Sequence, residues 1–267
     1  MITLKSDDEI ALMRAAGLVV ARTLDVVRAA VAPGVSTLEL DRVAEREIRG
    51  AGAEPSFKGY RGFPATLCTS INDEIVHGIP SAQRVLRAGD LVSVDCGAIV
   101  GGYHGDAAVT VPVGEVGPEL VELLRVCEES LWQGIAAAHL GGRLRDISAA
   151  IEGYVTPYGY GIVQGYGGHG IGQRLHEEPH VLNYVEPRSG RGPKLVRGLV
   201  LAVEPMVNLG GHAAEELDDG WTVVTVDGLP SAHFEHTFTL TANGPWVLTA
   251  HDGGAARLAQ VLAATHA

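Results

Sequence analysis

The chain repeats one order of elements twice, and this order constrains its fold more than any other feature of the sequence. In each half, two helix-like segments precede a short apolar run that ends in a carboxylate, at Asp95 in the first half and at Glu204 in the second. This likeness predicts an internal two-fold repeat. Any two buried strands would look equally apolar, so the runs by themselves leave the repeat open.

Short capping signals set the helix boundaries. A serine followed three residues later by glutamate, as at Ser6 and Ser36, is a capping box that starts a helix, and Pro-Gly or Gly-Gly pairs stop one. The predicted helices run from Ser6 to Pro33, from Ser36 to Gly50 or Gly52, from Pro118 to Gly141, and from about Arg145 to Tyr154.

Length and composition indicate how many domains to expect. The 267 residues are 46% hydrophobic, which is enough for one substantial core, and no Pro/Ser-rich linker divides them. We predict a single α/β domain over 1–267, with halves at about 1–115 and 116–250.

Charge and hydropathy exclude several kinds of partner. The net charge of −12, with dispersed basic residues, repels a phosphate backbone, so no specific nucleic acid is expected. No run approaches the ~18 apolar residues that cross a bilayer. The first residues show no export signal, which predicts a cytoplasmic chain that does not enter a membrane. The three cysteines are too scattered for a disulfide framework, and we expect free thiols.

Asp95 and Asp106 form the first candidate site. Asp95 lies in an alternating strand, and the residues after Val100 turn the chain back so that Asp106 returns beside it. Burying a carboxylate is costly unless a cation or a donor neutralises it, so the pair implies a metal or a shared proton. Taken alone, the pair is equally compatible with residues that cap turns at the margin of a sheet.

Further residues that can bind metals favour a metal site over a shared proton or turn caps. Glu204 ends the second apolar run, Glu235 lies in an alternating segment, and His169 sits in a glycine-rich stretch. Four carboxylates and one imidazole suit Mn, Fe(II), Co or Zn, and bridging carboxylates can hold two such ions ~3.5–4 Å apart. The predicted two-metal hydrolase site consists of Asp95, Asp106, His169, Glu204 and Glu235.

Two other motif matches fail on their context. Residues 165–170 satisfy the dinucleotide pattern G-x-G-x-x-G, but Pro179 interrupts the helix that should follow. We therefore predict a flexible loop that carries His169. Residues 176–180 spell H-E-x-x-H, yet Pro179 also prevents the helical turn that would direct both histidines at one zinc ion. His176 is close enough in sequence to His169 to reach the same cleft.

An aromatic segment supplies a candidate pocket. Tyr60, Phe63 and Cys68 precede His77. They either pack in the core or form the wall of an apolar pocket that has His77 at its rim. Cys68 has no adjacent base motif, so we do not expect it to act as a nucleophile.

Taken together, the motifs resemble those of bacterial type I methionine aminopeptidases. The matching segments are GYRGFP (59–64), SINDE (70–74), HGIP (77–80), VDCG (94–97), GHGIG (168–172), HEEP (176–179) and FEHT (234–237), and the resemblance extends from about Asp8 to Leu248. It implies the pita-bread fold, in which a curved antiparallel sheet is covered by paired helices and carries a dinuclear metal site.

The resemblance also implies roles for individual residues. Asp95 would chelate one ion, Asp106 and Glu235 would bridge both, and His169 and Glu204 would complete the other. Two histidines match family residues that contact the substrate, and five further residues match positions around the methionine pocket. These are His77 and His176, and then Tyr60, Phe63, Cys68, Tyr166 and Trp221.

The implied reaction is removal of the N-terminal methionine from nascent proteins and peptides, with a preference for a small second residue. Two divalent ions would activate a hydroxide whose proton passes through Glu204. The implied partners are nascent chains, with a transient ribosome contact, and the chain is expected to be a monomer. Arg61, Val76 and Leu175 depart from the common family pattern, which leaves the fine specificity of the pocket open.

Two rival functions share this fold. Xaa-Pro aminopeptidases and prolidases generally carry a further N-terminal domain, for which residues 1–60 leave no room. A peptide-binding homologue without catalysis would typically have lost metal ligands, and here all five are present.

Overall fold

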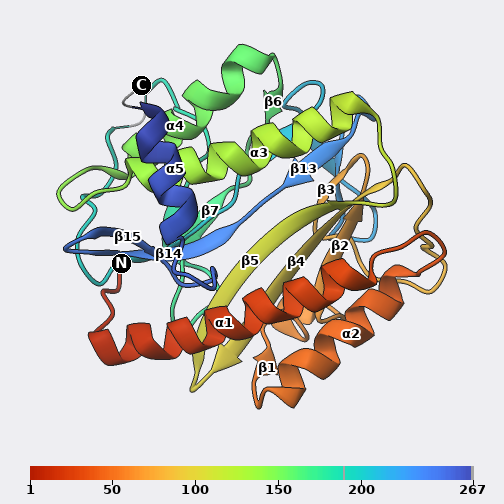
Figure 1. Ribbon diagram of the computed structural model, residues 1–267, viewed down its shortest axis with the longest axis horizontal. Coiled ribbons are helices and arrows are strands. Elements are labelled where there is room, and N and C mark those ends of the chain that lie inside the picture. Colours follow the sequence, from red (N-terminus) through yellow and green to blue (C-terminus); the bar gives the residue numbers. More distant parts are fainter. Residues whose placement is uncertain (189, 266–267) are drawn as a thin grey trace.

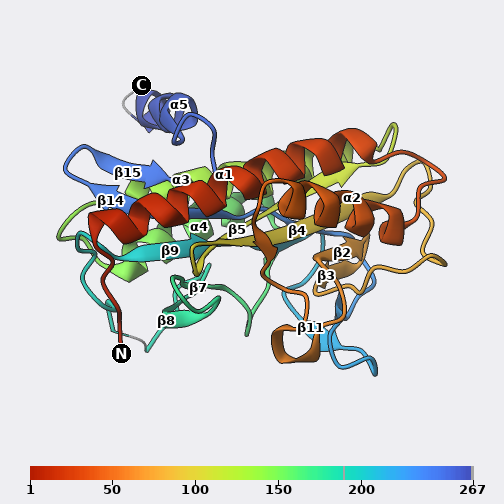
Figure 2. The same ribbon diagram turned by 90° about the horizontal axis from the view of Figure 1, so that it is seen from below.

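The computed structural model describes residues 1–188 and 190–265 and has a mixed α/β architecture (Figure 1). In the view of Figure 2, α1 to α4 form a layer on one side of β4, β5 and β9, whereas β3, β7, β8 and β11 lie on the other side. The sheet therefore has a face covered by helices and a face left to short strands and loops, and the second face is available for a site.

The first four helices lie at the predicted segments, whereas the C-terminal helix was not predicted. The helices are α1 (Asp7–Ala30), α2 (Thr37–Gly50), α3 (Pro118–Ala137), α4 (Leu144–Val155) and α5 (Ala255–Thr265), with short 3-10 helices at Tyr60–Gly62 and Thr156–Tyr158. Both predicted capping boxes are present, because Ser6 and Ser36 each accept a hydrogen bond from the glutamate amide three residues on. No helix within the described residues has both the length and the apolar content needed to traverse a bilayer.

The strands pair in antiparallel fashion throughout. They are β1 (Glu54–Pro55), β2 (Leu67–Ile71), β3 (Glu74–Val76), β4 (Leu91–Val100), β5 (Tyr103–Pro112), β6 (Gly161–Ile162), β7 (Gly168–Gly170), β8 (Glu177–Val181), β9 (Val200–Val203), β10 (Met206–Asn208), β11 (Ala214–Glu216), β12 (Val223–Thr225), β13 (Ser231–His233), β14 (His236–Thr241) and β15 (Gly244–Val247). The two larger sheets have the orders β1-β4-β2, with β5 paired to β4, and β15-β14-β9-β7-β8. The smaller ones are β13-β10-β6 and β11-β12-β3.

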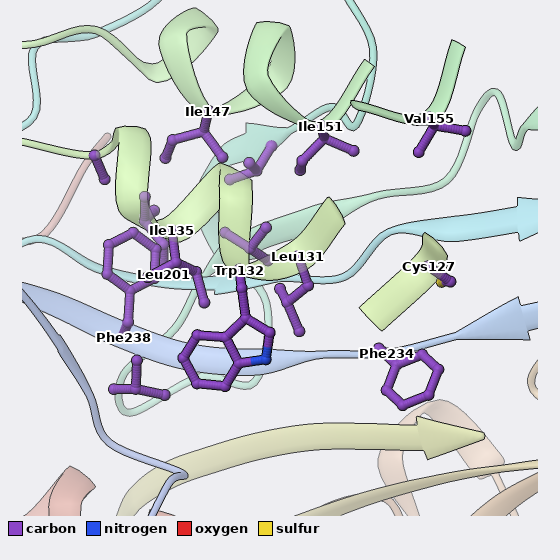
Figure 3. Packing of buried hydrophobic residues seen from close by; sticks show 14 of the residues in the cluster. Cys127, Leu131, Trp132, Ile135, Ile147, Ile151, Val155, Leu201, Phe234 and Phe238 are labelled. Atoms are coloured by element: carbon purple, nitrogen blue, oxygen red, sulfur yellow. The ribbon is translucent and has the colours of Figure 1, made fainter. Parts of the chain in front are cut away.

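Each helix pair buries its apolar face on a sheet. The first core joins α1 and α2 to β4 through Val20, Leu40 and Val94. The second joins α3 and α4 to β9 and β14, where Leu131, Ile147, Leu201 and Phe238 interdigitate (Figure 3). Burial of this apolar area drives the packing, and it leaves the opposite side of the strands free to carry polar groups.

A close approach of backbones fixes α1 on the sheet. A side chain at Gly105 in β5 would place its Cβ 2.7 Å from the backbone nitrogen of Gly17 in α1. A Cβ at Gly17 would instead lie 2.3 Å from the Leu248 carbonyl oxygen, so each glycine leaves room for a different backbone segment. The hairpin β4–β5 is thereby held rigidly, with Asp106 opposite Gly97 in its register.

The prediction that a flexible loop carries His169 is wrong for 168–170, although residues 165–167 form no helix or strand. Gly168–Gly170 form strand β7, which pairs with β8 on one side and β9 on the other. The glycines permit close strand contact, since a Cβ on Gly168 would lie 2.2 Å from the Ala202 carbonyl oxygen. The prediction for the H-E-x-x-H segment is confirmed. Residues 177–181 form the extended strand β8, so this segment does not form a helical zinc site.

The N-terminal arm is tied to the segment that carries His176 by a buried ion pair. Lys5 Nζ lies 2.7 Å from Glu177 Oε2, and both side chains are at most 5% exposed. The backbone amide of Lys5 also donates to the Gly198 carbonyl at 2.7 Å. Residues 172–176 form no helix or strand of their own, so this pair restrains them from outside.

Replacing Lys5 with Met should lower the free energy of unfolding by about 3–5 kcal/mol, because the Glu177 carboxylate would stay buried without its cation. Urea denaturation measures this loss. The matched control is Arg197→Gln, which breaks the exposed Arg197–Asp7 pair and should leave the denaturation midpoint unchanged. Equal effects of the two changes would contradict a specific role for the buried pair.

Candidate metal centre

Five predicted ligands converge on the open face of the sheet from five different segments. Asp95 and Asp106 lie on the paired strands β4 and β5, and His169 lies on β7. Glu204 directly follows β9, and Glu235 lies between β13 and β14. The Glu235 amide donates to the Ala108 carbonyl of β5 at 2.9 Å, which joins the second sheet to the first at this point.

The donor atoms form two overlapping groups. One group consists of Asp106, His169 and Glu235, and the other of Glu204, His233 and Glu235, with the donor atoms of each group lying within 4.8 Å of one another. His169 Nε2 is 3.8 Å from Asp106 Oδ2 and 3.6 Å from Glu204 Oε1. These separations exceed hydrogen-bond lengths but suit donors around a shared cation.

Several of these polar atoms are buried without a partner. Asp95 Oδ1, Asp106 Oδ1, Glu235 Oε1 and His233 Nε2 make no hydrogen bond to any other described residue. Each unpartnered buried atom of this kind is costly. Four at one place are the arrangement expected where a cation supplies the missing interactions, so the residues fit a metal.

Electrostatics leads to the same conclusion. Burial raises the pKa of Asp95 to about 7, and the neighbouring Glu204 charge adds to the increase. Burial, followed by repulsion from Asp95 and Glu204, raises the pKa of Asp106 well above its usual value. The pKa of Glu235 is raised well above its usual value for the same two reasons. Without a cation, the cluster holds protons that ordinary carboxylates would release.

Glu204 differs from its neighbours. Burial raises its pKa, but the adjacent imidazoles of His233 and His169 lower it by more, so the pKa is about 2. Its carboxylate is therefore ionised at neutral pH. The Asn183 amide nitrogen donates to the Glu204 backbone carbonyl at 3.0 Å and helps to fix this segment.

Two histidines lie beside the centre in their neutral form. The ring centroids of His176 and His169 are 4.3 Å apart, and His176 Nδ1 is 2.9 Å from the Tyr60 hydroxyl. Burial, aided by His169, lowers the pKa of His176 to about 4. His77 has a backbone φ of 61°, a left-handed conformation that few non-glycine residues adopt, and burial lowers its pKa.

An apolar cavity of about 310 Å³ adjoins the carboxylates. Its lining contains Tyr60, Phe63, Cys68, His77, His176 and Trp221, together with Arg61, Leu175 and the five predicted ligands. The Phe63 and Trp221 rings meet edge to face at 5.0 Å. Tyr60, Phe63, Cys68 and Trp221 thus line the cavity and also pack together in one apolar cluster.

Tyr166 is placed at a neighbouring cleft of about 470 Å³, which shares His77, His169, His176 and Glu204 with the apolar cavity. Its ring meets His77 edge to face at 6.2 Å. Cys68 is buried opposite Asp95, and burial raises the pKa of its thiol well above the usual value. A thiol in that state is a poor nucleophile, which agrees with the expectation from sequence.

One residue of the centre was missed by the sequence analysis. His233 is 1% exposed, and its Nε2 lies 3.6 Å from Glu204 Oε2. The sequence feature that could have identified His233 is its position two residues before Glu235. In an extended segment this spacing places both side chains on one face. His233 is not part of the recognised FEHT motif, so the motif alone did not mark it.

Comparison with known proteins defines the family. The sequence model of metallopeptidase family M24 matches residues 11–242. Methionine aminopeptidase of Clostridium acetobutylicum is 53% identical over 249 residues, covering 93% of this chain and 99% of that protein. Methionine aminopeptidase 1 of Mycobacterium tuberculosis is 52% identical over 251 residues, covering 92% and 94% respectively.

Solved structures agree with the sequence relatives. The crystal structure of methionine aminopeptidase from Thermotoga maritima has a TM-score of 0.90 at 42% identity and covers 93% of this chain and 99% of that one. Prolidase from Pyrococcus furiosus shares the fold at a TM-score of 0.74 and 23% identity, and 65% of its own chain is covered. The chain belongs to metallopeptidase family M24 and has its pita-bread fold. Within that family it is one of the bacterial type I methionine aminopeptidases.

The metal-free protein should lose stability as the pH rises. The folded state holds protons on Asp95, with a pKa of about 7, that the unfolded chain releases near 3.8, so the free energy of unfolding falls as pH increases through this window. Buried His236 has a pKa lowered to about 4 from 6.5, and its opposite effect is confined to pH values below about 6.5.

Thermal melts in a chelator, at pH values from about 6.5 to about 8, measure this effect free of the histidine contribution. Saturating divalent metal should raise the melting temperature, and more at the higher pH, because metal binding releases the retained protons. Asp106→Asn is the control, since it removes one charge and should stabilise the metal-free protein at the higher pH. A metal-free melting temperature that rises with pH across this range would contradict the argument.

Proposed function

We propose that this chain hydrolyses the peptide bond after an N-terminal methionine and prefers a small second residue. The observation that carries the proposal is the apolar cavity, lined by Phe63 and Trp221, that opens directly onto the carboxylate cluster. A methionine side chain is flexible and apolar and suits such an aromatic wall. The relatives that cover nearly the whole chain are named for the same reaction.

Two divalent cations would be held by Asp95, Asp106, His169, Glu204 and Glu235, with Co, Mn, Fe(II) and Zn as the candidate metals. The unpartnered oxygens of Asp95, Asp106 and Glu235 support this assignment. Divalent cations bound there would lower the pKa of a coordinated water towards ~7 and so supply a nucleophile at neutral pH.

The side chains of the chain itself have separate tasks in this proposal. Glu204, ionised and close to two imidazoles, takes up the proton from the attacking water and passes it to the leaving amine. His176 is neutral and can donate a hydrogen bond to the developing oxyanion, with its other nitrogen held by Tyr60. His77, which lines both the cavity and the cleft, contacts the substrate backbone in this proposal.

The pocket assignment follows from the same geometry. Tyr60, Phe63, Cys68, Tyr166 and Trp221 surround the methionine side chain in this proposal. The remaining cleft, beyond Tyr166, receives the polypeptide that follows the methionine.

We further propose that residues 1–267 act as one catalytic domain with halves at about 1–115 and 116–250. It would work as a cytoplasmic monomer on nascent chains, with a transient ribosome contact.

Replacing Glu204 with Gln should lower kcat for Met-Ala-Ser by about 100-fold or more, which corresponds to ~3 kcal/mol of transition-state stabilisation. KM should change far less, because Phe63 and Trp221 are untouched. Steady-state kinetics with each metal measures the two constants. Near-wild-type kcat in this variant would remove Glu204 from the proton-transfer role.

Substrate preference separates the proposal from the other peptidases that share the fold. Met-Ala-Ser should be cleaved, whereas Gly-Pro and Xaa-Pro peptides should not, because burial of a long apolar side chain in the aromatic cavity stabilises the bound substrate. Liquid chromatography of the products provides the readout. Faster hydrolysis of an Xaa-Pro peptide would favour a prolidase-like function, and binding without any hydrolysis across all four metals would favour a peptide-binding role.

A further inference from the structure

We propose that His233 is an additional nitrogen donor of the metal centre, beside the five residues that the family motifs supply. The inference rests on the proposed function only for the presence of bound divalent cations. His233 ends strand β13 and is 1% exposed, and its ring is directed at the carboxylate cluster rather than at solvent or the core.

The strongest observation is the grouping of the donor atoms. Glu235 belongs to both groups, once with Asp106 and His169 and once with Glu204 and His233. Each group thus contains one imidazole, and Glu235 belongs to both. Glu204 lies 3.6 Å from the nearest ring nitrogen of both His169 and His233, so His233 lies among the same carboxylates as the predicted ligand His169.

The distance to Glu204 supports ligation more than hydrogen bonding. His233 Nε2 and Glu204 Oε2 are 3.6 Å apart, whereas an N–H···O bond measures ~2.9 Å. Two donors that each lie ~2.1 Å from one ion can be separated by as much as ~4.2 Å. The nitrogen is also buried without a hydrogen-bond partner among the described residues. An imidazole nitrogen in that state lacks an interaction that a cation would provide.

The backbone holds His233 in place before any ion binds. Its amide donates to Thr110 Oγ1 at 2.8 Å, and the same hydroxyl lies 2.9 Å from the His233 carbonyl oxygen, to which it donates. Met206 pairs with His233 across strands β10 and β13. Strand pairing therefore fixes the backbone of His233, as it does the backbones of Asp106 and His169.

An added imidazole should change which metal the centre prefers. Nitrogen donors favour Co²⁺ and Zn²⁺ over Mn²⁺ more strongly than carboxylates do. Loss of the His233 ring should therefore weaken Co²⁺ binding more than Mn²⁺ binding. This difference distinguishes a ligand from a residue that only supports the fold.

The test compares the metal-free wild type with His233→Gln and with His251→Gln. His251 is an exposed histidine that pairs with Asp25 on the surface, so its replacement controls for the loss of one imidazole. Calorimetric titration with Co²⁺ alone should show binding at least ~10-fold weaker in His233→Gln. Titration with Mn²⁺ should show a smaller change, and the visible absorption spectrum of bound Co²⁺ should shift. His251→Gln should match the wild type in every measurement.

Co²⁺ affinity and a Co²⁺ spectrum equal to those of the wild type would overturn the proposal. Weaker binding with an unchanged spectrum would also overturn it, because His233 would then act only by orienting Glu204. If His233→Gln fails to fold by circular dichroism, His233→Ala is titrated with added imidazole, which should restore the wild-type spectrum, and failure to restore it counts against ligation. If the wild type binds Co²⁺ but cleaves no methionyl peptide, the proposed function is contradicted. The Co²⁺ titrations would still decide whether His233 is a metal ligand.

Discussion

The cost of burying several carboxylates close together is the constraint on which the rest of the structure depends. Asp95, Asp106 and Glu235 lie together on the open face of the sheet, and burial and proximity raise the pKa of each. Such a cluster opposes folding unless protons or cations neutralise it. The two apolar cores, one under each helix pair, must therefore supply enough stability to hold these groups in place.

The fold meets this constraint by separating its two faces. The helices bury one side of the strands, so the ligand side chains can occupy the other side and still be held by rigid strand pairing. Gly17 and Gly105 bring α1 against β5, and the Glu235–Ala108 hydrogen bond joins the sheets at the centre. The irregular segment that carries His176 is restrained by the Lys5–Glu177 pair. The residues of the proposed reaction are thus positioned by elements that are far apart in the chain.

Local sequence predicted the parts of the structure that depend on local forces. The capping boxes at Ser6 and Ser36 located two helices, since a helix terminus needs side-chain partners within the next few residues. The proline in 176–180 excluded a helix for an equally local reason, and the segment is a strand. The cost of burying charge, together with the family motifs, selected five residues that do lie together. Sequence failed at 168–170, where high glycine content suggested a continuation of the loop, because the close contacts that require those glycines come from β8 and β9.

The sequence by itself determined the family, the starts of α1 and α2 and the types of ligand that this protein can offer, because these depend on residue identity and short spacing. Only the tertiary structure decided how the ligands are grouped, that His233 faces Glu204, and that Lys5 is buried against Glu177. Those contacts join segments separated by up to 172 residues. They result from strand register and from the packing of two sheets, which no local pattern in the chain encodes.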